Sequence, residues 1–213
     1  MRDFIAERWT HILADSWQHL SLVVQCLILA TIIGVVCAAL SYQHPRLAVL
    51  ANNVSTVGLT IPSFALVGIL IIPFGFGVLP AVIVVTFFAT LPILRNAVVG
   101  LSEMNSNIVS AARGIGMSRI DTFFRVELPL AWPVILAGMR VSAQMTMGIA
   151  AVAAYALGPG LGGYIFSGLS RLGGANSFES VATGVIAVVI LALLLDLALI
   201  LLGRFTISRG IRV

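Results

Sequence analysis

Two charged side chains, Arg140 and Asp196, lie deeper within long apolar segments than any other charges in the sequence. At about 1.5 Å per helical residue, both would lie roughly 12–14 Å from one end of a membrane-spanning helix. Charges inside a membrane are costly and usually pair or line a polar pathway, so we expect Arg140 and Asp196 to pair or to share a polar network. Gln144 follows Arg140 by one helical turn, and it either lines a pathway or makes a hydrogen bond between helices.

A polar stretch, Ser110–Pro129, lies between two apolar segments. It carries five charged side chains, which are Arg113, Arg119, Asp121, Arg125 and Glu127. Its first half consists mostly of small, helix-compatible residues, and Ser118 is placed to cap a second short helix. Pro129 suits the first turn of a new helix. The stretch therefore predicts a short surface helix, a turn and the entry into the next membrane helix.

Several kinds of chemistry are excluded by residues that the sequence lacks. Every basic side chain apart from histidine is an arginine, and a Walker A loop needs a lysine, so the chain is not a standard P-loop ATPase. The three histidines form no cluster with cysteine or aspartate at metal-ligand spacing, and no Gly-x-Ser-x-Gly elbow occurs. Gly158–Gly163 satisfies Gly-x-Gly-x-x-Gly, but it follows a membrane helix rather than a strand, so we expect a flexible turn outside the membrane. We therefore expect no cofactor, metal or catalytic site in this chain.

The composition identifies an integral membrane protein. Of the 213 residues, 60% are hydrophobic and only 9% are charged, whereas a soluble domain carries roughly 25% charged residues. The formal net charge is +4, but the arginines lie at the ends of apolar segments rather than in a stripe, which argues against nucleic-acid binding. The fold class that follows is an all-α integral membrane protein.

Five membrane-spanning segments are expected, because a span needs about 20 apolar residues. They cover residues 19–42, 47–74, 81–99, 131–157 and 178–203. The second segment is interrupted at Asn52-Asn53 and again at Ile61-Pro62-Ser63. A proline within a span frees a backbone carbonyl, which is tolerated where the helix faces protein or a cavity. We therefore place Pro62 and Ser63 against protein or a polar pathway.

The chain divides into three parts. Residues 1–18 predict an amphipathic helix at the external surface of the membrane, although a soluble extension that packs on a partner is also consistent with them. Residues 19–203 form one transmembrane domain with a cytoplasmic loop at 101–129, and residues 204–213 form a basic cytoplasmic tail. Because arginines are richer at the loop and tail, that side is cytoplasmic and the N-terminus lies outside. The sequence shows no inverted repeat, which many secondary transporters have.

The central loop resembles the EAA loop of ABC-importer permeases, which has the pattern Glu-Ala-Ala-x3-Gly-x9-Ile-x-Leu-Pro. Ser110 occupies the glutamate position and Val126 the isoleucine position, while the remaining positions match. The residues that this resemblance assigns to coupling with an ATPase are Ser110, Ala111, Ala112, Arg113, Gly114, Gly116, Leu128 and Pro129.

The resemblance extends over nearly the whole chain and narrows to the permeases of osmoprotectant importers. The supporting segments are Thr60–Leu66, Leu91–Asn96, Ala137–Arg140 and Gly160–Phe166. It implies a MetI-like type I ABC importer permease fold in the bacterial cytoplasmic membrane. The solutes of that branch are glycine betaine, carnitine, choline and proline betaine, whose cationic heads an aromatic cage can bind. Such a cage is not evident in this sequence, so we expect selectivity to reside in a binding protein.

The resemblance also implies the partners. Two permease chains, either two copies or two paralogues, would enclose a central pathway. Each would insert its loop into a groove of a cytoplasmic ATPase dimer that binds ATP and magnesium, and an external binding protein or lipoprotein would deliver the solute. ATP binding would favour one conformation of the pathway over another. The residues expected along the pathway or in an intramembrane polar network are Pro62, Ser63, Arg95, Asn96, Arg140, Gln144 and Asp196.

Three alternatives follow from the same residues. Related permeases transport other small solutes, such as methionine or a sulfonate. A different class, an ATP-independent secondary transporter or channel subunit, would have no reason to carry the Ser110–Pro129 loop. A static membrane scaffold would not need the prolines and glycines that interrupt the spans.

Replacing Asp196 with asparagine would leave Arg140 as an uncompensated charge within a membrane helix. We expect this variant to reduce assembly of the protein in the membrane more than it alters the choice of solute. Purification yield and size-exclusion profiles would measure assembly, and competition between solutes would measure choice. Normal assembly with a changed solute preference would contradict the prediction.

Overall fold

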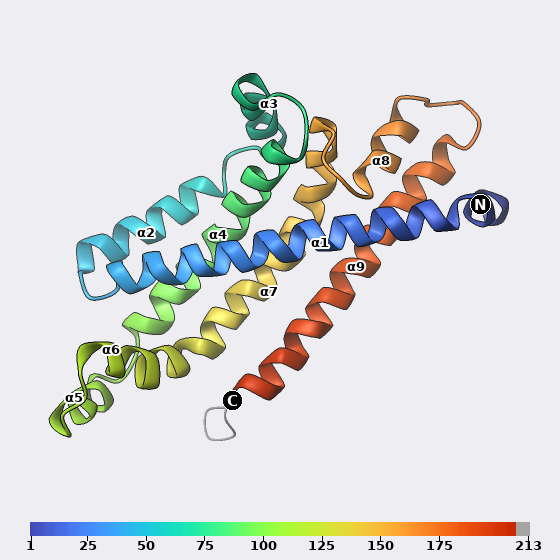
Figure 1. Ribbon diagram of the computed structural model, residues 1–213. Coiled ribbons are helices and arrows are strands. Elements are labelled where there is room, and N and C mark those ends of the chain that lie inside the picture. The colour runs from blue at the N-terminus through green and yellow to red at the C-terminus, as the bar shows by residue number, and fades with distance from the viewer. Residues whose placement is uncertain (208–213) are drawn as a thin grey trace.

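Residues 1–207 are described by a computed structural model and are mostly helical (Figure 1). Four helices are long and apolar enough to cross a membrane, namely α1 (Arg2–Ser41), α4 (Val78–Ser102), α7 (Leu128–Ala153) and α9 (Ser177–Thr206). A fifth span results if the bent pair α2 (Pro45–Gly58) and α3 (Ser63–Phe74) is counted as one. The described residues contain no strand. The all-α fold with about five spans is therefore confirmed.

Helices α4 and α7 pack side by side at the centre of the bundle, and α1 crosses both of them (Figure 1). Small residues allow close contact between helices in membranes. Gly34 of α1 lies against the fully buried Ile93 of α4, and Gly138 of α7 lies against Asn96 of α4. Helix α9 and α8 (Gly162–Leu169) pack together beside α7, while α2 and α3 pack on α4.

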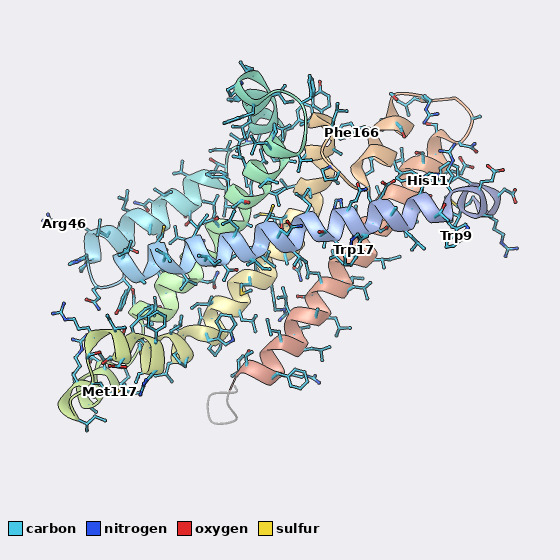
Figure 2. All side chains as sticks on the ribbon, viewed as in Figure 1. Trp9, His11, Trp17, Arg46, Met117 and Phe166 are labelled. Carbon is cyan, nitrogen blue, oxygen red and sulfur yellow. The ribbon has the colours of Figure 1, made fainter. Side chains whose placement is uncertain are left out.

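The N-terminal segment is continuous with the first span. Helix α1 runs from Arg2 to Ser41 without a break, so the expected boundary at residue 18 is not marked by the end of a helix. The first turns of α1 run in a different direction from the rest (Figure 1). Within residues 1–18, Trp9 is 56% exposed and Trp17 is 71% exposed; both are labelled in Figure 2. Exposed tryptophans suit a membrane interface, and the interface location stays a prediction.

The second span is broken once. Helices α2 and α3 meet at 93° across residues 59–62. Pro62 lacks an N–H group and disfavours helical geometry at Ile61, so one helix cannot continue through this point. The predicted break at Pro62 is confirmed. The polar interruption at Asn52-Asn53 does not break the helix: both asparagines lie inside α2, where each costs no more than about 0.7 kcal/mol relative to alanine.

The arginines gather at the two ends of the bundle. We call the end with α5 (Ser106–Gly114) and α6 (Arg119–Thr122) the loop end, and the end with α8 the connector end (Figure 1). The loop end carries Arg46, Arg113, Arg119, Arg125 and Arg204, and the connector end carries Arg2, Arg8 and Arg171. This is the grouping that the sequence predicts. Arg209 and Arg212 of the expected basic tail lie outside the described residues.

The glycine-rich connector between α7 and α9 begins with a turn over residues 157–161, as expected, and this turn packs against the bundle. The connector also contains α8, and its Leu161 is fully buried. Gly160 has a φ of +110°, and a Cβ there would lie 2.7 Å from the Cβ of His19. His19 is itself fully buried, with its Nε2 3.1 Å from the carbonyl oxygen of Met147. The connector thus lies directly against α1, and glycine permits this approach because it has no side chain.

Gly162 and Gly163 offer a matched test of this packing. A Cβ at Gly162 would overlap the carbonyl oxygen of Ala151, whereas a Cβ at Gly163 would meet no atom within 4 Å. We expect Gly162→Ala to destabilise the protein by about 1–3 kcal/mol, since overpacking forces the backbone to shift. Gly163→Ala should leave stability nearly unchanged. Thermal unfolding of both variants in one detergent measures the difference, and equal melting temperatures would show that the connector is not packed in this way.

Candidate functional site

The Ser110–Pro129 stretch folds into short helices joined by a turn, as the sequence predicts. Helix α5 is capped by Asn105, whose side chain accepts a hydrogen bond from the Asn107 amide at 2.9 Å. Helix α6 is capped by Ser118, whose hydroxyl accepts a hydrogen bond from the Asp121 amide at 3.1 Å. The predicted cap at Ser118 is therefore confirmed, and the caps fix where each short helix begins.

Gly116 forms the turn between these two helices. Its φ is +90°, a left-handed conformation that other residues adopt only with strain. The Gly116 amide donates to the carbonyl of Arg113, and the Met117 amide donates to the carbonyl of Ala112. A Cβ at Gly116 would meet no atom within 4 Å. Glycine is therefore required at this position by the backbone conformation and not by lack of space.

The loop exposes large apolar side chains at the loop end of the bundle. The label of Met117 in Figure 2 shows where the loop lies. We call four of these residues the loop patch: Ile108, Ile115, Ile120 and Phe124. Their exposed fractions are 44%, 82%, 72% and 62%, in that order. Small residues of the EAA-type pattern, such as Ala111 and Gly114, are also exposed. Clustered apolar groups on a polar, non-spanning segment indicate a surface that another protein covers.

A buried carboxylate ties the loop to the bundle. Glu127 is 3% exposed, and it accepts a hydrogen bond from the hydroxyl of Tyr42 at 2.5 Å. Arg113 of α5 lies 3.9 Å from the same carboxylate. Gln43 donates to the Tyr42 hydroxyl at 2.6 Å.

The role of Glu127 is not predicted from the sequence. Its partners come from the end of α1 and from α5, and no sequence spacing relates them to the start of α7. The local signal is an acidic residue between Val126 and Leu128, in the π-helical turn Phe123–Glu127. Such turns often occur at functional sites. A cavity of about 370 Å³ remains between α5 and the bundle, so this polar contact holds the loop more than close packing does.

Arg140 and Asp196 form the pair that the sequence predicts. The Arg140 Nε donates to Oδ1 at 2.7 Å, and its Nη2 donates to Oδ2 at 2.9 Å. Gln144 lies one turn after Arg140 in the same helix. The Arg140 side chain remains 39% exposed and the Asp196 side chain 15% exposed. Because two parallel hydrogen bonds fix the relative orientation of both groups, the pair ties α7 to α9.

The other residues expected along a pathway do not join this pair. Pro62 and Ser63 lie at the break between α2 and α3. Arg95 is exposed on α4, while the Asn96 amide donates to a carbonyl one turn earlier in its own helix at 2.9 Å. Within residues 1–207, no hydrogen bond or ion pair links these four side chains to the pair. Their assignment to a pathway stays a prediction.

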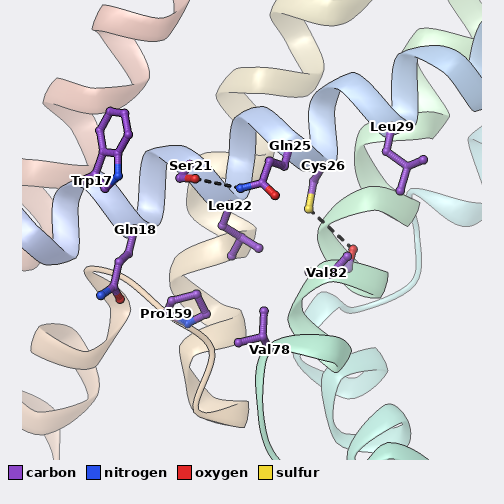
Figure 3. Close-up of a pocket in the computed structure, with 10 residues that line it drawn as sticks. All are labelled: Trp17, Gln18, Ser21, Leu22, Gln25, Cys26, Leu29, Val78, Val82 and Pro159. Atoms are coloured by element: carbon purple, nitrogen blue, oxygen red, sulfur yellow. Dashed lines mark hydrogen bonds between the residues drawn. The ribbon is translucent and has the colours of Figure 1, made fainter.

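A cavity of about 460 Å³ lies between α1 and the start of α4 (Figure 3). The Gln25 amide donates to the Ser21 hydroxyl at 2.8 Å on one side, and the Cys26 Sγ lies 3.8 Å from the Val82 carbonyl oxygen. Trp17 lies at the edge of the cavity. Among the described residues that line it, none belongs to the loop, and none is charged. The cavity is therefore separate from both features above.

These features define a class of protein. Four or five apolar helices form a membrane bundle, and one end of it presents a helical loop with exposed apolar side chains. No group of three or more metal-binding side chains occurs in the part of the chain that the structure describes. The architecture is that of a multi-helix membrane protein with a helical loop at one end of the bundle. The chain belongs to the family of binding-protein-dependent transport system inner membrane components, which it matches over residues 30–207.

Known relatives align over nearly the whole chain. The osmoprotectant import permease protein OsmW of Salmonella typhimurium is 37% identical over 202 residues, which cover 92% of each chain. The carnitine transport permease protein OpuCB of Listeria monocytogenes is 35% identical over 196 residues, covering 92% of this chain and 88% of that protein. The glycine betaine/carnitine/choline transport system permease protein OpuCB of Bacillus subtilis is 32% identical over 213 residues, covering 100% and 96%.

The fold has a counterpart among solved structures. A chain of the MetNI methionine ABC transporter, in an inward-facing conformation, aligns with a TM-score of 0.77 and 22% sequence identity. The alignment covers 92% of this chain and 96% of that chain. The MetI-like permease fold is therefore confirmed.

Two loop arginines provide a matched test of the contact with Glu127. Arg113 faces the buried carboxylate, whereas Arg125 lies 3.6 Å from the exposed Asp121. Weakening the surroundings of a buried carboxylate costs about 1 kcal/mol or more, while an exposed pair contributes under about 0.5 kcal/mol. We expect Arg113→Gln to lower the melting temperature by about 2–4 °C and Arg125→Gln to change it very little, as measured by thermal unfolding. An equal or larger loss for Arg125→Gln would refute the assignment.

Proposed function

We propose that this chain is the transmembrane permease subunit of an ATP-driven importer for a quaternary-ammonium or betaine-type osmoprotectant. The family match over residues 30–207 supports the permease role. Relatives named for carnitine, choline and glycine betaine transport align over most of the chain and support the solute class. In this function the chain catalyses no reaction, and ATP hydrolysis takes place in a separate subunit.

The exposed loop patch is the observation that best supports a role of this loop in coupling the permease to an ATPase. Its four apolar side chains, Ile108, Ile115, Ile120 and Phe124, are exposed on the short helices and the turn that precede α7. A groove of a cytoplasmic ATPase subunit would cover them, and small exposed residues such as Ala111 permit close approach. The ATPase dimer would bind ATP and magnesium, so the permease needs no cofactor of its own.

Motion of the ATPase would reach the bundle through one helical rod. Residues 119–156 form a single helical segment, which runs from α6 through the π-helical turn into α7. Displacing α6 would therefore displace α7, and with it the Arg140–Asp196 tie to α9. An ATPase that binds ATP would favour one orientation of this rod, and the population of pathway conformations would shift accordingly.

The loop end would face the cytoplasm, because arginines near the ends of spans accumulate on that side. The N-terminus and the connector end would then lie outside, where a solute-binding protein or lipoprotein delivers the solute. A second permease chain, a copy or a paralogue, would complete the pathway. Exposed Arg95 and the break at Pro62 support this arrangement, since neither suits contact with lipid.

Co-purification from the native membrane tests the coupling role. Gly116→Asp would strain the turn at φ +90° and place a charge beside the loop patch, so we expect the ATPase to be lost from the purified complex. Gly163→Asp adds the same charge at an exposed position of the connector end and should retain the ATPase. Mass spectrometry of the co-purified proteins would also identify the second permease chain as a copy or a paralogue.

Reconstituted uptake tests the solute class. Proteoliposomes that contain the whole complex and its binding protein should accumulate labelled glycine betaine, choline or carnitine only when ATP reaches the ATPase. If the complex takes up methionine or a sulfonate and none of these solutes, the proposed solute class is wrong and the chain serves a different small solute. Uptake without ATP, or the absence of any ATPase after gentle extraction, would favour an ATP-independent transporter or channel subunit.

A further inference from the structure

Three aromatic rings from distant parts of the chain meet at the connector end. They are Phe64 of α3, Tyr155 of the short 3-10 turn Ala154–Ala156, and Phe166 of α8, which is labelled in Figure 2. The ring centroids of Phe64 and Tyr155 are 4.8 Å apart, and those of Tyr155 and Phe166 are 5.7 Å apart. We call these three residues the aromatic row. The sequence alone does not reveal this group of rings, because the three residues come from separate elements that are far apart in the chain.

The aromatic row presents open ring surface. Phe64 is 50% exposed and Tyr155 is 49% exposed. Across residues 1–207, none of the three side chains forms a hydrogen bond or an ion pair. Both rings therefore keep accessible apolar surface that a ligand could contact.

The row lies where the broken span approaches the end of α7. Phe64 is the second residue of α3 and follows directly after the 93° break. Tyr155 lies two residues beyond Ala153, the last residue of α7, and the carbonyls at this helix end create a partial negative charge. The Gly77 amide, from the turn before α4, donates to the Ala156 carbonyl at 2.7 Å and holds this turn in place. The surroundings therefore favour a cation at the external end of the proposed pathway.

A trimethylammonium group is matched to such a surface. It carries no N–H group, so hydrogen-bond acceptors cannot recognise it, whereas ring faces attract it within about 6 Å of a ring centroid. The row contains no charged side chain, so its attraction for a cation stays modest. A site within a transport pathway needs this balance, because the solute must both enter and leave.

We propose that the aromatic row receives the methylated ammonium head of the solute after it leaves the binding protein and before it enters the pathway. Phe64 and Tyr155 supply the ring faces, and Phe166 supports Tyr155 from α8. The inference rests on the proposed function and adds that the permease itself recognises the cationic head.

The test measures the maximal rate of ATP-driven uptake of labelled choline and glycine betaine by the complete complex, at saturating binding protein. Tyr155→Leu removes the ring and should lower the rate about fivefold, while Tyr155→Phe restores the ring and should recover most of the rate. Phe178→Leu removes a 75% exposed ring at the same end of the bundle and serves as the matched control, which should transport like the parent. Co-purification of the ATPase verifies that each variant assembles.

A fluorinated series keeps the shape of the ring while it weakens the negative face. Phenylalanine with one, two or three ring fluorines at position 155 should lower the uptake rate stepwise. Equal rates across the series, or equal losses for Tyr155→Phe and Tyr155→Leu, would overturn the inference and leave the importer function intact. A parent complex that takes up no quaternary-ammonium solute would overturn the proposed function and the inference together.

Discussion

The buried carboxylate of Glu127 determines how the loop is attached to the bundle. A buried charge must be compensated by donors, and here they come from the end of α1, through Tyr42, and from α5, through Arg113. A cavity of about 370 Å³ lies between α5 and the bundle, and Glu127 lines it together with Tyr42 and Arg113. The carboxylate therefore links α5 to the bundle across this cavity, although Glu127 belongs neither to the loop patch nor to the proposed pathway.

Helix α7 connects the features that the proposed function requires. The 38-residue helical segment that contains it extends about 57 Å, well beyond the roughly 30 Å of a bilayer core. Glu127 lies near its first end, Arg140 lies within it, and Tyr155 lies at its far end. The contact with α9, the proposed docking of the loop and the proposed recognition of the solute would thus involve one element. Energy transferred to one end can reach the other without an intervening flexible joint.

Features that depend on local spacing are predictable from this sequence. The spans, the cap at Ser118 and the break at Pro62 each follow from residues next to one another, and the Arg140–Asp196 pair follows from counting depth along two spans. Contacts between groups with no fixed spacing are not predictable in this way, which is why the partners of Glu127, the aromatic row and the packing of the connector on His19 appear only in the structure. The paired asparagines interrupt the apolar segment without ending the helix, because their weak intrinsic preference is overridden by the surrounding helix.

The right-angled break in the second span gives this part of the chain a joint. Backbone hydrogen bonds end at Ile61, whose amide donates to Gly58, and resume at Pro62, whose carbonyl accepts from Leu66. Rotation of the backbone at Ile61 therefore breaks no hydrogen bond, whereas bending an intact helix would break several. Helix α3 begins at Ser63, directly after this joint, and Phe64 is its second residue. A rotation of α3 about the joint would therefore change the spacing of Phe64 from Tyr155.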